Sequence, residues 1–160
     1  MKKFAFIFLL PYALCLMPLS THAARQKHPS KNEINGPVAA TVNYIFDGDT
    51  FAAAVKIADD IEISVRIRIK QIDAPELEAR CDAERTGAIA AKNRLAELLP
   101  DGAHIQLYNI KDDKYLGRID ANVHLSDGRD VGEIMVTGGF AREYNGGKRA
   151  GWCDESGLAH

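Results

Sequence analysis

The 160-residue sequence has no internal repeat and no low-complexity tract, and outside its first residues it matches one small domain with a single core. It also lacks a glycine-rich loop that ends in Lys-Ser or Lys-Thr, the pattern of a nucleotide phosphate loop. Zinc-ligand spacing is missing as well, because four of its histidines are scattered along the chain. These are His28, His104, His124 and His160.

An excess of positive charge is absent too. The chain has 20 Lys and Arg against 22 Asp and Glu, a formal net charge of −2. A protein that coats nucleic acid irrespective of sequence needs many cations to neutralise phosphates, so that class is disfavoured. A few cations gathered at one place can still act on phosphate groups, and an enzyme remains open.

Long apolar runs are confined to the N-terminus. Lys2 and Lys3 precede a mostly apolar stretch at 4–19, and Thr21-His22-Ala23 offers small residues for cleavage. This pattern predicts a secretory signal peptide at 1–23, with an uncleaved membrane anchor as the alternative. Cleavage would remove the two lysines and change the formal charge from −2 to −4. We therefore expect an exported protein, periplasmic or secreted.

The polar, aperiodic segment 24–36 predicts a disordered lead-in, which leaves 37–160 as the folded domain. Of three cysteines, Cys15 falls within the signal peptide, and Cys81 and Cys153 remain. An even number in an exported chain predicts a disulfide, with two free buried thiols as the alternative. The bridge would close a loop of about seventy residues and stabilise the fold by about 4 kcal/mol on the chain-entropy model.

Hydrophobic periodicity predicts five short strands, with a long helix after the third strand and a short helix after the fifth. The strands are expected at 39–46, 51–57, 63–69, 105–110 and 119–125. Asp82 is expected to cap the helix Ala83–Leu99, and Asp130 with Glu133 resembles a capping box for the short one. This order predicts a mainly β, α+β fold, a small barrel of the oligonucleotide-binding (OB) type.

The third strand carries a pattern of its own. Ile63, Val65, Ile67 and Ile69 alternate with Ser64, Arg66, Arg68 and Lys70. A period of two predicts one buried face and one outward-facing cationic face.

Three segments hold residues suited to phosphodiester chemistry: Asp47-Gly48-Asp49-Thr50, the stretch RIKQIDAPE at 68–76, and DDKYLGR at 112–118. Asp-Gly is first of all a hairpin signal. Two carboxylates on separate loops also suit a hard cation that prefers oxygen ligands. A further carboxylate can take a proton from water, and two guanidiniums can each bind phosphate oxygens in a two-pronged manner.

In these segments the chain resembles the staphylococcal nuclease-like (thermonuclease) family. The matching residues are Asp47-Gly48-Asp49-Thr50, Arg68 with Asp73-Ala74-Pro75-Glu76, Asp113-Lys114-Tyr115-Leu116-Gly117-Arg118, and Gly139-Phe140-Ala141. They occur in the family's order and span about 38–144. Leu116 is an extra residue in a loop that is shorter in the family's archetype.

The resemblance implies a five-stranded OB-type barrel and calcium-dependent hydrolysis of DNA, RNA or both, with little sequence preference. It assigns Arg68, Glu76 and Arg118 to catalysis. Asp49, Asp73 and the main-chain carbonyl of Ala74 would bind one calcium ion per chain, with Asp47 as support behind them. Lys114 and Tyr115 would contact the nucleotide, one as a phosphate partner and the other as an aromatic platform.

Other functions remain open from the sequence. A non-catalytic nucleic-acid-binding module on the same barrel is the first alternative, and a disulfide-bonded partner-binding domain is the second. Magnesium and manganese also accept oxygen ligands. Nothing in the sequence implies a stable protein partner, so we expect a monomer.

Overall fold

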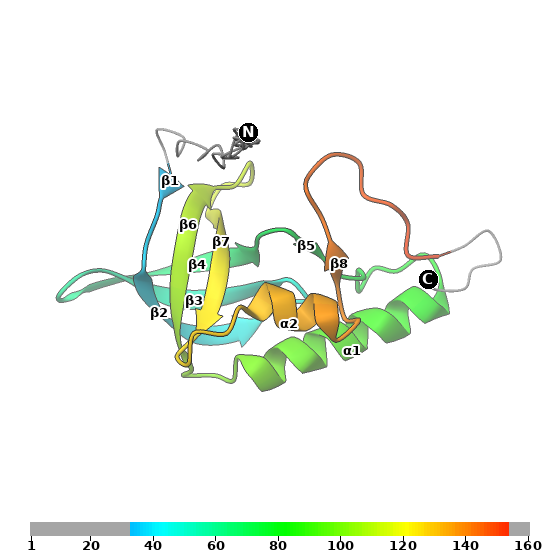
Figure 1. The fold of residues 1–160 in the computed structure, drawn as a ribbon, viewed down its shortest axis with the longest axis horizontal. Coiled ribbons are helices and arrows are strands. Elements are labelled where there is room, and N and C mark those ends of the chain that lie inside the picture. Colours follow the sequence, from blue (N-terminus) through cyan, green and yellow to red (C-terminus); the bar gives the residue numbers. More distant parts are fainter. Residues whose placement is uncertain (1–32, 154–160) are drawn as a thin grey trace, which may run out of the picture.

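Five strands close into a barrel in the computed structural model, which describes residues 33–153 (Figure 1). They are β2 (Val38–Ile45), β3 (Thr50–Ala58), β4 (Ile61–Ile69), β6 (His104–Asp112) and β7 (Arg118–Leu125). The hydrogen-bonded order is β6-β2-β3-β4-β7, and β7 pairs back with β6. Only the β4–β7 pair among these is parallel. The predicted OB-type α+β fold is confirmed.

Three two-residue strands lie outside the barrel wall. β1 (Glu33–Ile34) pairs with β6, and β5 (Ile72–Asp73) pairs with β8 (Arg142–Glu143) in a separate small sheet. The predicted lead-in at 24–36 is therefore wrong at its end, because Glu33 already belongs to a strand and pairs with Lys70 Nζ at 2.9 Å. The rest of that segment and the predicted signal peptide fall in 1–32, outside the described residues. No helix among the described residues is long and apolar enough to cross a membrane.

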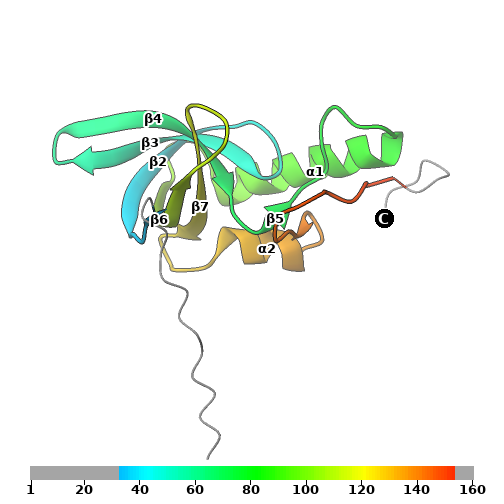
Figure 2. The same ribbon diagram turned by 90° about the horizontal axis from the view of Figure 1, so that it is seen from above.

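β4 differs from its predicted alternation at two positions. Ile67 and Ile69 are buried as expected, but Ile63 is 44% exposed. The reason is that β3 and β4 continue beyond the other strands as a projecting hairpin (Figures 1 and 2). Arg68, expected on an outward-facing side, is only 8% exposed, because it pairs with a buried carboxylate described below.

The long helix α1 (Asp82–Leu98) lies along one side of the barrel (Figure 1). It begins one residue earlier than predicted, and its N-cap is Cys81 rather than Asp82. Cys81 has an extended backbone, and its Sγ accepts the Glu84 backbone N–H at 3.4 Å, while the Glu84 carboxylate accepts the Arg80 N–H at 2.9 Å. These contacts use N–H groups that the first helical turn leaves without partners. The helix buries Ala88, Ala91 and Leu95.

The short helix α2 (Val131–Thr137) covers another part of the barrel. Asp130 is its N-cap, as predicted, and accepts the Glu133 N–H at 2.9 Å. Val131 and Met135 are fully buried in the same core as the barrel residues. Gly139, with φ of +75°, then turns the chain toward β8.

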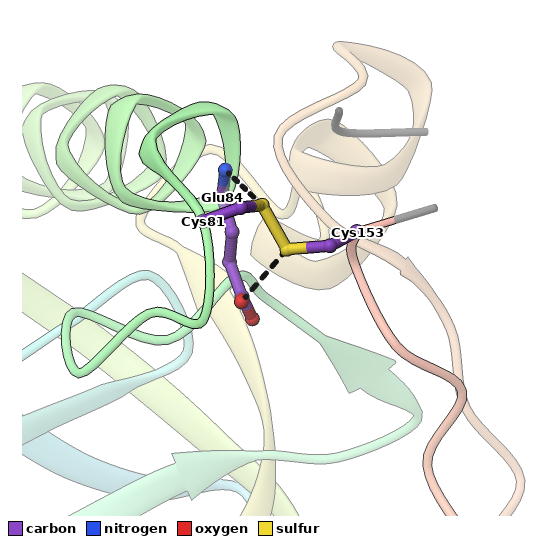
Figure 3. Close-up of side chains that lie close together, drawn as sticks. All are labelled: Cys81, Glu84 and Cys153. Carbon is purple, nitrogen blue, oxygen red and sulfur yellow. Dashed lines mark hydrogen bonds between the residues drawn. A yellow bond between two sulfur atoms is a disulfide. The ribbon is translucent and has the colours of Figure 1, made fainter. Parts of the chain in front are cut away.

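Cys81 and Cys153 form a disulfide, the pairing that the sequence predicts (Figure 3). It links the cap of α1 to the segment that follows β8, across 72 positions of sequence. Figure 1 shows this segment arching from β8 back to the first turn of α1. The bond therefore holds the segment 144–153 beside the barrel end where β5 lies.

Candidate active site

The turn between β2 and β3 places Asp49 at the barrel wall. Phe46 N–H donates to the Thr50 carbonyl at 3.0 Å, which closes the turn. The Asp49 N–H donates to Asp47 Oδ1 at 3.0 Å, so the Asp47 side chain fixes the backbone of Asp49. Asp47-Gly48-Asp49 is thus a turn, and it also directs a carboxylate inward.

Gly48 lets this turn approach its neighbours closely. A Cβ on Gly48 would lie 2.6 Å from the Cβ of Ala91 in α1 and 2.7 Å from the Cβ of Ala74. Real Cβ atoms do not approach this closely, so only glycine fits. The Asp-Gly-Asp turn consequently packs directly on the loop that carries Asp73 and Ala74.

Asp49 is nearly buried, with 7% of its surface exposed. Its Oδ2 lies 3.0 Å from Nη2 of Arg68, and its Oδ1 accepts the Thr50 hydroxyl at 2.7 Å. The Ala74 N–H also donates to Oδ2, at 3.4 Å, and so connects the two loops. Burial raises the pKa of Asp49 above its ordinary value, although the Arg68 guanidinium acts in the opposite direction.

Asp73 is 2% exposed, and its two oxygens have different surroundings. Oδ2 accepts hydrogen bonds from Arg142 Nε and Nη2 at 3.2 and 3.0 Å and from Trp152 Nε1 at 3.2 Å. Oδ1 is buried and accepts no hydrogen bond from any described residue, although Arg149 Nε lies 3.1 Å away. A buried anionic oxygen that accepts no hydrogen bond needs a cation beside it. Arg149 is that cation here, and a hard metal cation would suit the same oxygen.

Arg68 is buried in the barrel wall. Nη1 donates to the carbonyl of Ile69 and Nη2 to that of Ile72, each at 3.0 Å. With the Asp49 ion pair, these bonds fix the plane of the guanidinium. Arg68 therefore also connects β4 to the start of the Asp73 loop.

Arg118 opens β7 and has a more open environment than Arg68. Its Nε forms a short ion pair with Asp113 Oδ2, and its Cζ lies 4.5 Å from the centroid of the Tyr115 ring. The pair with Asp113 uses Nε and leaves both terminal amino groups out of that contact. Burial raises the pKa of Asp113, but hydrogen bonds from Arg118 and from the Lys114 N–H outweigh burial and lower that pKa below its ordinary value.

Glu76 lies at the surface of the site, where its Oε1 meets Arg149 Nη1 at 2.5 Å. Arg149 thus contacts both Glu76 and Asp73. Burial lowers the pKa of Arg149, but the neighbouring Asp73, Asp49 and Glu76 carboxylates outweigh it and raise that pKa above its ordinary value. The same three acidic residues therefore surround one guanidinium.

A single cleft of about 1890 Å³ joins most of the predicted site residues. Its lining includes Asp47, Asp49, Arg68, Glu76, Lys114, Tyr115 and Arg118. Asp73 and Ala74 do not line it; Asp73 is covered on this side by Arg149, which does. Leu116, the extra loop residue, is fully exposed at the rim.

The sequence alone does not place Arg142, Arg149 or Trp152 in the site. The Trp152 indole N–H donates to Asp73 Oδ2, and the Trp152 ring centroid lies 4.0 Å from Arg142 Cζ. The predicted disulfide held a usable signal. If Cys153 is bonded to Cys81, the residues just before Cys153 must lie near those just before Cys81, which include the Asp73 loop.

A second cluster of candidate metal ligands is not a metal site. Cys81, Glu84 and Cys153 each offer a ligand atom within 4.8 Å of the others. The two sulfurs are bonded to each other, so neither is a thiolate that can bind a metal. Figure 3 shows the disulfide between α1 and the C-terminal segment, with Glu84 Oε2 lying 3.4 Å from Cys153 Sγ.

Comparison with known proteins agrees with this geometry. A family model described as staphylococcal nuclease homologue matches residues 66–154, more than half of the chain. A search of curated proteins returns no significant match. The family match implies a nuclease-type fold and a function related to nucleic acid. The chain belongs to the staphylococcal nuclease homologue family.

Proposed function

We propose that this chain is an exported, calcium-dependent nuclease that hydrolyses phosphodiester bonds of DNA, RNA or both with little sequence preference. The observation that carries the proposal is a pair of nearly buried carboxylates, Asp49 and Asp73, whose loops are joined by the hydrogen bond from the Ala74 N–H to Asp49 Oδ2. They lie at a cleft lined by Arg68, Arg118 and Glu76.

Asp49 and Asp73 would hold the calcium ion through their carboxylates, and Ala74 would add its main-chain carbonyl. When bound, calcium neutralises negative charge on the phosphodiester and on the two carboxylates. Arg142 and Trp152 occupy Oδ2 of Asp73 and thereby leave Oδ1 for the cation. Arg149 Nε lies 3.1 Å from Oδ1, so a cation bound to that oxygen would take the place of the Arg149 guanidinium.

Arg68 and Arg118 bind the phosphate from two strands and stabilise the charge that develops on its oxygens during attack. Glu76 accepts the proton of the attacking water, whose oxygen forms the new bond to phosphorus as the bond to the leaving oxygen breaks. Lys114 and Tyr115 contact the nucleotide from the β6–β7 loop, where Lys114 Nζ lies 5.0 Å from the Tyr115 ring centroid.

Export and the monomeric state are part of the proposal. The basic and apolar N-terminus and the Cys81–Cys153 disulfide support an oxidising compartment, periplasmic or extracellular. The cleft is lined by residues of one chain. Fractionation of expressing cells followed by N-terminal sequencing tests export, and sedimentation tests the monomer.

The decisive experiment incubates purified protein with plasmid DNA and with RNA, in calcium or in chelator. Calcium-dependent cleavage is the expected result. Binding without cleavage in calcium would support the non-catalytic module instead, and neither binding nor cleavage would support a structural or partner-binding domain. Cleavage that continues in chelator would overturn the metal assignment.

A further inference from the structure

A row of side chains crosses the barrel face next to Arg118. In the register of the sheet Arg118 pairs with Arg66, Arg66 with Ala52, and Ala52 with Tyr44. Residues paired directly across strands project on the same face of a sheet. The row therefore runs from β7 through β4 and β3 to β2, and it begins at an arginine of the candidate active site.

Cations and aromatic rings lie in contact along this row. Arg66 Cζ lies 4.2 Å from the centroid of the Phe46 ring, and the Phe46 and Tyr44 rings meet edge to face at 5.2 Å. Lys92 of α1 ends the row, with Nζ 5.6 Å from the Tyr44 ring. At the opposite end Arg118 lies over Tyr115.

The core does not account for these residues. Tyr44 is 57% exposed, and neither Tyr44 nor Phe46 belongs to the hydrophobic core or packs against it as a partly buried member. Phe46 and Arg66 line the same cleft as Arg68 and Arg118. The row is thus an exposed extension of the cleft, and its charged members are all cations.

We propose that Tyr44, Phe46, Arg66 and Lys92 form a stacking subsite for a single-stranded segment of the substrate, beside the phosphodiester that is cleaved. Proteins bind single strands by stacking bases on aromatic rings and by pairing backbone phosphates with cations along one groove. Arg66 and Lys92 supply the cations, and the two rings supply the platforms. Ala52 lies between Arg66 and Tyr44 in the register, and its small side chain leaves space above the sheet at that point.

This inference rests on the proposed function and adds a binding subsite to it. A base has to leave its duplex before it can stack on a protein ring. The subsite therefore favours single-stranded DNA or RNA, or a locally opened duplex, over a closed duplex.

Fluorescence anisotropy in chelator tests the subsite without cleavage. The probes are labelled oligothymidylate of about ten nucleotides, within the length range of single-strand sites, and a thymidylyl dinucleotide. We expect Tyr44→Ala, Arg66→Ala and Lys92→Ala each to weaken binding of the longer probe about fivefold or more, with dinucleotide binding unchanged. Phe46→Leu keeps an apolar side chain but removes the ring, so it should also weaken binding of the longer probe and leave dinucleotide binding unchanged.

Arg129→Ala is the matched control, because Arg129 is an exposed arginine paired with Asp127 outside the row. It should leave both affinities unchanged. The subsite is overturned if the row variants bind the longer probe as tightly as the unmodified protein, or if a duplex of equal length competes as well as the single strand. Tyr44 is exposed and Lys92 is half-buried, so the test stands even if Phe46→Leu fails to fold.

The plasmid assay on the same proteins separates this inference from the proposed function. No cleavage by the unmodified protein, together with row-dependent binding, overturns the nuclease and leaves the subsite. Cleavage together with row-independent binding overturns the subsite alone.

Discussion

The indole Nε1–H of Trp152 donates a hydrogen bond to Oδ2 of Asp73 at 3.2 Å, although 79 positions separate the two residues in the sequence. Arg142 binds the same oxygen through Nε and Nη2 and lies over the Trp152 ring. The orientation of the Asp73 carboxylate therefore depends on the segment that the Cys81–Cys153 disulfide fastens.

Trp152→Phe should weaken calcium binding by about tenfold or more, because partners that orient a metal ligand typically contribute 10–100-fold to affinity. Phenylalanine keeps a ring beneath Arg142 and removes only the N–H donor. Isothermal titration with calcium measures the change. Lys148→Ala, in the same segment, serves as the control and should bind calcium normally; an unchanged affinity in Trp152→Phe would contradict the orienting role.

Cys153→Ser should lower the free energy of unfolding by about 4 kcal/mol, since the bond closes a long loop of the unfolded chain. It should also weaken calcium binding, because Arg142 and Trp152 lose their anchored position. Urea denaturation with and without reductant checks the first effect, and calcium titration checks the second. If the variant is as stable as the reduced parent protein and still binds calcium as tightly as the parent, the disulfide stabilises the fold without supporting the metal site.

Asp49→Asn and Asp73→Asn should each reduce calcium affinity and calcium-supported cleavage by about 100-fold or more, as a direct ligand matters at least as much as its supporting partners. Asparagine is preferred to alanine because it keeps the shape and the hydrogen-bonding oxygen of the side chain, although it too removes the negative charge. Asp59→Ala, a fully exposed carboxylate, is the control. Parental calcium affinity in both asparagine variants would remove the proposed metal site.

Arg68→Lys and Arg118→Lys should each slow single-turnover cleavage about 100- to 1000-fold, because lysine keeps the charge and loses the planar fork. Arg68→Lys should also lower the melting temperature, since Arg68 bonds two carbonyls and Asp49. Arg118→Lys should affect the rate alone.

Glu76→Gln should slow the same cleavage while calcium binding persists, because Glu76 is assigned to the water. Arg129→Ala again provides the unaffected comparison. Near-normal cleavage by Arg68→Lys or Arg118→Lys would remove that arginine from the phosphate site.

Asp120→Asn should stabilise the protein at neutral pH. Asp120 lies opposite Arg68 in the β4–β7 pair, and its Oδ1 is buried without a hydrogen bond from any described residue. Burial, followed by the Asp113 charge, raises its pKa above 3.8, while three nearby cations act in the opposite direction: Arg68, Arg118 and Lys70.

The raised pKa sets the sign of the pH effect. The folded state binds this proton more tightly than the unfolded state, so the parent loses stability as pH rises from 3.8 through the raised pKa. The asparagine variant lacks this loss. Its melting temperature should exceed that of the parent at neutral pH and match it below pH 3.8; a constant difference across that range would show that the carboxyl is not the cause.

By itself the sequence determined the barrel strands, both helices, the disulfide pairing and the loops that carry Asp49, Asp73 and Arg118. These are local or nearly local features: alternation along a strand, capping residues, turn residues such as Asp-Gly, and an even number of cysteines. One of its errors was also local. The helix cap moved from Asp82 to Cys81, because a backbone N–H takes whichever acceptor the turn brings near.

Only the tertiary structure decided how the carboxylates are partnered. Closure of the barrel buries Arg68 against Asp49, and the disulfide brings Arg142, Arg149 and Trp152 to Asp73 from the far end of the chain. The row from Arg118 to Tyr44 likewise exists only through strand register. Such contacts depend on which strand edges and chain ends meet in space, and a pattern read along one segment carries no information about its distant partners.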